Sequence, residues 1–273
     1  MAEEETKETV PEVIEEQSAE EIKQDWMDDL QIGLTFLTRI PVPGGLILSN
    51  PSLAQSTRFF PIIGALVGFI GGVIILVADF FGLPLVASVI IALLSIILIT
   101  GAKNEDGLAH TADVITKRGE DKEQQFEIIR DNQFGTTGVL VLIFTVALKW
   151  SALSTTAPSQ AIVGIILMTV ISYGSLPLFM RYIPATEDDS LPIWNEQPEF
   201  DKITVSVVIS LIISFFAVGF LPTLVIIIVL IIILGLASWL VTYIFGGKTR
   251  QVLGGLQQIS EIFVCLSIAA LNI

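Results

Sequence analysis

The chain has 273 residues, of which 52% are hydrophobic and only 15% are charged, and its mean hydropathy is +0.77. A water-soluble domain carries about 25% charged residues, so the composition excludes an ordinary soluble domain and indicates an integral membrane protein. The single cysteine, Cys265, excludes an internal disulfide and a cysteine-rich zinc site, and the single histidine, His110, excludes a metal site built from several histidines.

The formal net charge of −14 is concentrated at the N-terminus, since residues 1–30 contain twelve acids and two lysines. This charge balance gives no reason to expect nucleic-acid binding. The first residues also lack the basic start and apolar stretch of a signal peptide. We therefore predict that residues 1–24 form an acidic cytoplasmic arm, disordered in part, ahead of a membrane-embedded domain over residues 25–273.

Apolar residues recur at helical spacing from Trp26 to Leu37, which predicts a helix lying against the membrane or the bundle. Seven longer apolar stretches follow, at residues 59–81, 84–100, 138–153, 161–180, 203–220, 222–245 and 259–271, and the last could begin at Leu253. A backbone in lipid must satisfy its own hydrogen bonds, and about 20 apolar residues cross a bilayer. The predicted fold class is therefore all-α, a polytopic membrane helix bundle with about seven transmembrane helices.

Basic residues alternate between the connections. Thirteen of the fourteen lie before the first span or in every second connection, at residues 1–58, 101–137, 181–202 and 246–258. Because cytoplasmic loops carry the excess of lysine and arginine, we predict a cytoplasmic N-terminus, an external C-terminus and chemistry at the cytoplasmic face. The exception is Lys149 inside a span, which either has a functional partner or reaches the outer interface beside Trp150.

The first predicted span carries a glycine repeat. Gly64, Gly68 and Gly72 stand at every fourth position and so share one face of a helix. Small residues allow helix backbones to approach closely in lipid. We therefore predict that this face packs against another helix.

Acidic side chains gather after the second predicted span. On a helix, Asp106, His110 and Asp113 stand at i, i+4 and i+7 and share one face, with Glu105 beside them. Carboxylates grouped in this way can hold Mg²⁺, which takes one or two carboxylates together with substrate phosphates and water. The metal would neutralise charge during phosphoryl transfer. The alternative is a solvated helix start, where acids suit the helix dipole.

Two further segments combine glycines with charged residues. One carries Arg130 and Asp131, and it is either a phosphate contact through the guanidinium or an ion pair within a helix. The other spans residues 246–255 and carries Lys248 and Arg250, which could hold anionic oxygens or could simply belong to a flexible basic loop. It is not a Walker loop, because the spacing differs and no strand precedes it.

Five blocks in chain order resemble the signatures of the cobalamin synthase family, also called adenosylcobinamide-GDP ribazoletransferases. They are FLTRIPVP at 36–43, FPIIGALVG at 60–68, NEDGLAHTADV at 104–114, IRDNQFGTTG at 129–138 and GGKTRQVLGG at 246–255. The likeness runs from Asp25 to the C-terminus, so only the acidic arm lies outside it.

The resemblance implies a bacterial inner-membrane enzyme that completes the assembly of vitamin B12. A hydroxyl of α-ribazole, or of its 5′-phosphate, would attack the phosphate of adenosylcobinamide-GDP nearest the cobinamide, GMP would leave, and Mg²⁺ would be the cofactor. The catalytic residues would be Asp106, His110, Asp113 and Asp131. The metal ligands would be Glu105, Asp106, Asp113 and Glu261, and the substrate contacts would be Arg39, Arg130, Lys248, Thr249 and Arg250.

The chain departs from the family pattern at five positions. Asn104 replaces a histidine, His110 an aspartate, Val114 a glycine, Gln251 an aspartate and Gln258 an acid. The site thus offers less negative charge to a metal. Two alternatives therefore stay open: a catalytically impaired member that acts as a corrinoid-binding scaffold or transporter, and an enzyme of the CDP-alcohol phosphotransferase type.

Overall fold

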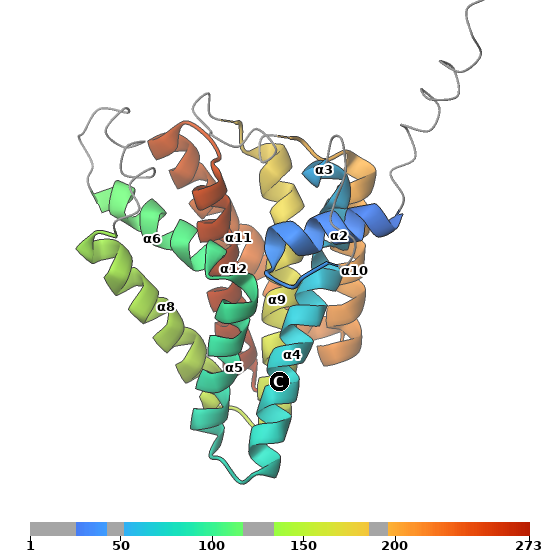
Figure 1. Ribbon diagram of the computed structural model, residues 1–273, viewed down its shortest axis with the longest axis vertical. Helices are drawn as coiled ribbons and strands as arrows, with labels where there is room; N and C mark the ends of the chain where they lie inside the picture. The colour runs from blue at the N-terminus through green and yellow to red at the C-terminus, as the bar shows by residue number, and fades with distance from the viewer. Residues whose placement is uncertain (1–25, 43–51, 117–133, 186–195) are drawn as a thin grey trace, which may run out of the picture.

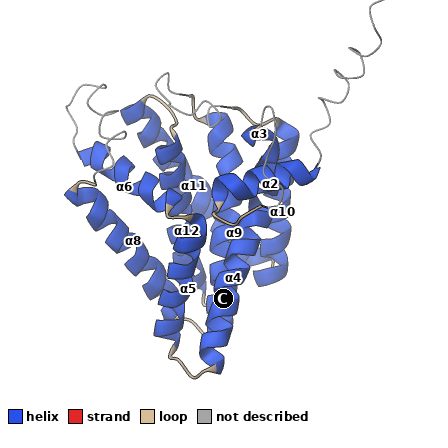
Figure 2. Cartoon of the chain, viewed as in Figure 1, coloured by secondary structure: helices blue, strands red, loops and turns tan. Residues whose placement is uncertain are grey.

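The structure is a computed structural model and describes residues 26–42, 52–116, 134–185 and 196–273. Within these ranges every regular element is a helix, as Figure 2 shows, and the one strand-like feature is an isolated parallel bridge between Ala185 and Lys248. The helices stand side by side in a bundle (Figure 1). The predicted all-α class is confirmed, whereas the predicted acidic arm at 1–24 lies outside the described residues.

Seven long helices coincide with the seven apolar stretches. They are α4 (Phe60–Phe80), α5 (Leu85–Thr100), α8 (Thr136–Ser154), α9 (Pro158–Tyr182), α10 (Phe200–Val218), α11 (Phe220–Phe245) and α12 (Arg250–Leu271). Six helical stretches are long and apolar enough to cross a membrane, and α5 brings the number to seven if it is counted with the helix that follows it. The protein is therefore a multi-pass membrane protein.

The last helix begins earlier than the sequence predicted. α12 starts at Arg250, one turn before the alternative start at Leu253 and well before residue 259. Its N-cap is Thr249, whose hydroxyl accepts a hydrogen bond from the backbone N–H of Val252 at 3.3 Å. The glycine pair at 254–255 made this first turn resemble a loop in the sequence, although it is helical.

The chain turns by 90° between α5 and α6 (Lys103–Thr116). Gly101 and Ala102 make the corner with φ angles of +69° and +56°. A glycine suits this left-handed conformation because it has no Cβ. With 16 residues, α5 is only about 24 Å long, and α6 runs across the bundle between α8 and α12 (Figure 1).

The inner helices are α9 and α12, and α10 and α11 lie at the periphery. The most apolar windows of α9 and α12 are 67% and 72% buried, against 17% and 22% for α10 and α11. The predicted glycine face of α4 packs along α9: a Cβ at Gly64 would lie 2.5 Å from the carbonyl oxygen of Thr169, and one at Gly72 would lie 3.0 Å from Ile162. This prediction is confirmed.

A short helix crosses the start of α4. α2 (Trp26–Leu37) is followed by α3 (Leu53–Ser56) and the 3₁₀ turn η1 (Thr57–Phe59). The predicted helix is present, but its inward face includes Asp29, while Trp26 is 68% exposed. Asp29 faces inward because Arg58 of η1 pairs with its carboxylate. Burial nevertheless raises the pKa of Asp29 above its ordinary value, against the opposing effect of Arg58.

Candidate active site

Helix α6 lies at the centre of the candidate site, because α12 packs against it with almost no space between the two backbones. Gly107 of α6 faces the backbone of Gln251. A Cβ at Gly254 of α12 would lie 3.1 Å from the Cα of Asn104. The blocks at 104–114 and 246–255, which are far apart in sequence, therefore meet along one contact.

The block at 36–43 joins the same corner. The backbone N–H of Arg39 donates to the carbonyl of Ile99 at 2.7 Å. The ammonium of Lys103 donates to the carbonyl of Phe36, in the last turn of α2, at 2.9 Å and to that of Thr38, just after the helix, at 3.3 Å. A lysine at the C-terminus of a helix satisfies carbonyls that have no partner within the helix. The start of α6 is thereby fixed against the end of α2.

Asp113 joins α6 to the start of α8. Its carboxylate accepts hydrogen bonds from the backbone N–H groups of Gly135 and Gly138, both at 2.7 Å, and the residue is 2% exposed. Gly135 is the N-cap of α8 and has no side chain to supply this bond, so Asp113 caps the helix from another element. A Cβ at Gly138 would lie 2.5 Å from the same carboxylate, which explains the small residue there.

Asp106 is the carboxylate of α6 that faces outward. Its side chain is 46% exposed, and its Oδ1 lies 3.5 Å from Nε2 of His110. The His110 ring is buried and lies 5.1 Å from the ring of Phe134, measured between centroids. The predicted face is confirmed for Asp106 and His110, with the imidazole placed behind the carboxylate.

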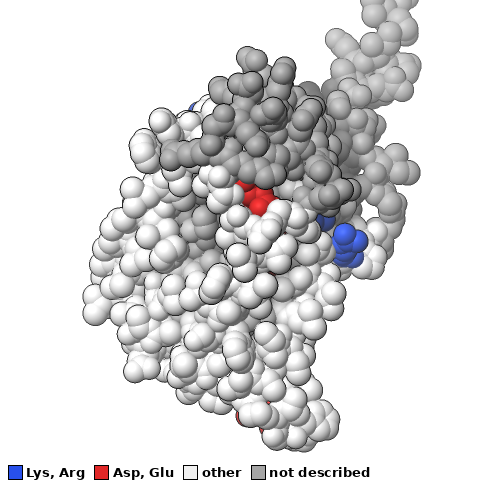
Figure 3. Space-filling model, turned by 90° about the vertical axis from the view of Figure 1, so that its left-hand side faces the viewer, with Lys and Arg blue, Asp and Glu red and all other residues white. Residues whose placement is uncertain are grey.

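On the face shown in Figure 3, charged side chains gather in the upper half, and the surface below is uncharged apart from an acidic spot at the lower tip.

Three basic side chains, those of Arg39, Lys103 and Arg250, gather at the α5–α6 corner. Arg39 is exposed and Arg250 is half-buried. Both lie close enough to Lys103 for their positive charges to repel its ammonium. Lys103 and Arg250 line a small cleft together with Asn104 and Gly254. Guanidinium groups bind phosphate oxygens in a two-pronged geometry. The predicted substrate residues Arg39 and Arg250 are therefore placed where an anionic group can reach them.

Lys248 and Thr249 serve the fold instead of the predicted substrate contact. Lys248 is fully buried, and its ammonium donates to the carbonyl of Met180, with the carbonyl of Glu196 at 3.4 Å. Its backbone N–H donates to Pro184 at 2.7 Å. Thr249 is the buried N-cap of α12. These contacts fix the segment before α12 to the end of α9, and they explain why both residues face inward.

Glu105 and Glu261, two of the predicted metal ligands, belong to a buried polar network. Lys149 of α8 donates to Glu261 at 2.8 Å and to Gln258 at 2.7 Å. Gln257 donates to the other oxygen of Glu261 at 2.6 Å, and Gln258 donates to Glu105 at 3.3 Å. Lys149 therefore has the partner that one reading of the sequence required, and it does not reach the outer interface.

The predicted four-acid metal site does not assemble among the described residues. No group of three or more histidine, cysteine or acidic side chains there is placed to hold a metal ion. Glu261 is paired with Lys149, Asp113 caps α8, and Asp106 is a half-exposed carboxylate beside His110. The predicted residues Arg130 and Asp131 lie outside the described residues. The remaining carboxylate, Asp106, fits a cation that is held by one carboxylate together with substrate phosphates and water.

Sequence reasoning missed two contributors. Lys103 is the first residue of α6 and stands one position before the 104–114 block, but the sequence showed it only as one of the basic residues of the connection at 101–137. Gln257 was not noticed, because a glutamine within an apolar helix gives no sign of its partner. Its amide also donates to the hydroxyl of Ser172 at 3.0 Å and so joins α12 to α9.

The fold and these contacts define the class: a multi-pass helical membrane protein with a carboxylate and guanidinium groups beside a right-angled corner. Comparison with known proteins identifies the family within this class. The profile of the family described as cobalamin-5-phosphate synthase matches residues 29–269. The chain belongs to this family.

Curated relatives support the same assignment. The chain is 32% identical to the adenosylcobinamide-GDP ribazoletransferase of Bradyrhizobium diazoefficiens, over 89% of this chain and 93% of the relative. It is 32% identical to the protein of the same name from Shewanella amazonensis, over 86% and 92%, and 30% identical to that of Mesorhizobium japonicum, over 88% and 92%. No solved structure matches the chain.

Proposed function

We propose that this protein is an adenosylcobinamide-GDP ribazoletransferase, the enzyme of the last step of cobalamin assembly. The observation that carries the proposal is the meeting of separate sequence blocks at α6, where Asp106, Arg39 and Arg250 face the surroundings. Family membership and the names of the relatives support it. The proposed substrates are adenosylcobinamide-GDP and α-ribazole or its 5′-phosphate.

The reaction exchanges one phosphate ester bond for another. The ribazole hydroxyl oxygen forms a bond to the phosphorus nearest the cobinamide, the bond from that phosphorus to the bridging oxygen breaks, and GMP leaves with the electron pair. Asp106 accepts the hydroxyl proton, since it is the exposed carboxylate at the corner, and His110 at 3.5 Å orients it. Arg39 and Arg250 hold the diphosphate and offset its negative charge.

Magnesium is part of the proposal as a cofactor. The ion would be held by Asp106 together with the substrate diphosphate, and it would neutralise charge on the transferred phosphoryl group. Asp113 and Glu261 position helices in this arrangement and do not need to contact the ion, because their oxygens already accept hydrogen bonds. His110 adds no negative charge, so the diphosphate would supply most of the anionic ligands of the ion.

The direct test is a release assay. Membranes that contain the full chain are supplied with adenosylcobinamide-GDP, α-ribazole and Mg²⁺, and GMP is measured. We expect release that depends on ribazole and is lost with EDTA and in the Asp106→Asn variant. Release no higher than in that variant would favour a corrinoid-binding scaffold or transporter. Transfer to a CDP-alcohol in place of adenosylcobinamide-GDP would favour a CDP-alcohol phosphotransferase.

We place the protein in the bacterial inner membrane with the α6 corner at the cytoplasmic face. Segments carrying Arg39, Lys103 and Arg250 lie at one end of the bundle, and the positive-inside rule assigns such an end to the cytoplasm. Reporter fusions after Ser159 and after Asn195 test this assignment. We expect the first reporter outside and the second in the cytoplasm, and a reversed result would contradict it.

A further inference from the structure

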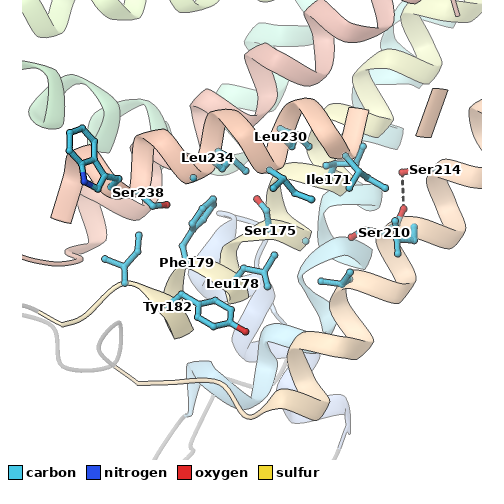
Figure 4. A pocket seen from close by; sticks show the side chains of 18 of the residues that line it. Ile171, Ser175, Leu178, Phe179, Tyr182, Ser210, Ser214, Leu230, Leu234 and Ser238 are labelled. Atoms are coloured by element: carbon cyan, nitrogen blue, oxygen red, sulfur yellow. Dashed lines mark hydrogen bonds between the residues drawn. The ribbon is translucent and has the colours of Figure 1, made fainter. Parts of the chain in front are cut away.

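An apolar groove runs between α9, α10 and α11, on a face that the reaction does not use. Its volume is about 610 Å³. Figure 4 shows Phe179 and Leu178 of α9 facing Leu230 and Leu234 of α11 across it. Several lining residues are exposed at the open side, among them Tyr182 and Trp239. The groove therefore opens sideways toward the lipid.

Small side chains on facing helices create the space. Ser175, Ser210, Gly235 and Ser238 line the groove where larger residues would fill it. A Cβ at Gly235 would meet no atom within 4 Å. α11 packs chiefly against α12, so it stands away from α9 along this side.

The serine hydroxyls that line the groove on α9 and α10 already have hydrogen-bond partners. Ser175 donates to Ser172 at 2.7 Å, Ser210 donates to Ser206 at 3.0 Å, and Ser214 donates to Ser210 at 2.7 Å, all within their own helices (Figure 4 draws the last). A nucleotide or a ribazole would lose its water here without gaining hydrogen bonds. The chemistry of the groove therefore suits a hydrocarbon.

The groove is about as long as a bilayer core is thick. The lining extends along α11 from Thr223 to Thr242, a distance of about 28 Å, which is close to the roughly 30 Å thickness of the hydrocarbon core. A flexible hydrocarbon chain of a lipid can therefore lie along the whole groove.

One end of the groove offers a place for a phosphate. Arg181 stands in the last turn of α9, next to Tyr182, with its guanidinium 4.7 Å from the centre of the Phe200 ring. The guanidinium donates to the amide oxygen of Gln197 at 3.5 Å, and among the described residues no carboxylate pairs with it. Trp239 and Tyr243 stack with centroids 5.9 Å apart near this end, as aromatic residues do at a membrane interface.

We propose that this groove binds one phospholipid, with an acyl chain along α11 and the phosphate at Arg181. The lipid would tie α11 to α9 and α10 across the gap. The site does not depend on the ribazole transfer reaction, and its occupancy can be measured without any assay of that reaction.

Native mass spectrometry of the purified full chain tests the proposal, with a phosphatidylglycerol as the added probe. We expect one bound lipid, and we expect Gly235→Trp to lower its affinity at least tenfold by filling the groove. Leu236→Trp is the matched control, since Leu236 is 61% exposed and does not line the groove. Arg181→Gln should weaken phosphatidylglycerol about tenfold and leave diacylglycerol, which has no phosphate, unchanged.

Two outcomes would overturn the proposal. One is equal lipid retention by Gly235→Trp and Leu236→Trp, with circular dichroism confirming that both variants are folded. The other is a dimeric wild type that Gly235→Trp converts to a monomer, which would assign the groove to a second copy of the chain.

Discussion

Asp106 and Arg39 at the α6 corner are open to the surroundings, whereas Lys149 and Glu261 lie inside the bundle. The Asp106 side chain is 46% exposed, and those of Lys149 and Glu261 are 4% and 2% exposed. Glu105 lies between the two regions, next to Asp106 in sequence and hydrogen-bonded to Gln258 of the buried network. The same residue types therefore occur in two very different environments within a few residues.

The difference separates structural charge from charge available for chemistry. A charged group in a low-dielectric interior is stable only when partners satisfy it. Lys149, Glu261 and Gln258 satisfy one another, so they have little capacity left for a ligand. At the corner, the carboxylate and guanidinium groups keep that capacity. Substitutions in the two regions should affect different measurements.

The largest effect is expected in the buried network. Lys149→Met leaves Glu261 charged and without its ion-pair partner, and we expect a loss of about 3–5 kcal/mol in the free energy of unfolding. The double variant Lys149→Met/Glu261→Met removes both charges and should recover most of the loss. Denaturation of the purified protein in mixed detergent micelles measures both. Equal destabilisation in the single and double variants would contradict the pairing.

Substitution at the corner should affect the reaction and not the fold. Asp106→Asn removes the proposed proton acceptor, and we expect kcat to fall about 100- to 1,000-fold with an unchanged unfolding midpoint. Asp79→Asn is the control, because Asp79 is an exposed aspartate at the end of α4 that leads to α5. A similar fall in both variants would remove Asp106 from the mechanism.

Two nearby basic residues offer a direct contrast. Arg250→Gln should raise the KM for adenosylcobinamide-GDP about tenfold, the expected loss for one charge-assisted hydrogen bond. Lys248→Gln should leave KM unchanged and lower the unfolding midpoint, because Lys248 is buried against Met180. Steady-state kinetics and thermal unfolding of both variants check this contrast, which the reverse pattern would refute.

The smallest expected effect concerns the cap of α8. Asp113→Ala removes the acceptor for Gly135 and Gly138 and should cost about 1–2 kcal/mol. The loss should be local, so hydrogen exchange at the first amides of α8 should quicken while those of α9 keep their protection. Unchanged exchange at Gly138 would show that the cap does not stabilise the helix.

The sequence predicted the helices well because long apolar stretches are a strong signal in a membrane protein. It missed the start of α12, where glycines resemble a loop, and it could not reveal the corner at Gly101. The site was harder to predict. Glu105 and Asp106 are adjacent and so point about 100° apart around the helix, which is why one joins the buried network and the other faces outward.

Partners distant in sequence account for the remaining differences. Lys149 and Glu261 are separated by 112 residues, and no local pattern links them. Asp113 was predicted as a metal ligand because it shares a face with Asp106, yet its carboxylate is taken up by the backbone of α8. Residue type and spacing identified the important blocks, and tertiary contacts decided what each residue does.

The shortness of α5 has a consequence for the membrane itself. Its 16 residues give about 24 Å, whereas the 26 residues of α11 give about 39 Å. The first value is less than the roughly 30 Å of a hydrocarbon core, so lipids beside α5 must thin or the polar headgroups must dip toward Gly101. Water and a soluble nucleotide can then meet the protein below the general level of the bilayer surface, which shortens the path between the aqueous phase and α6.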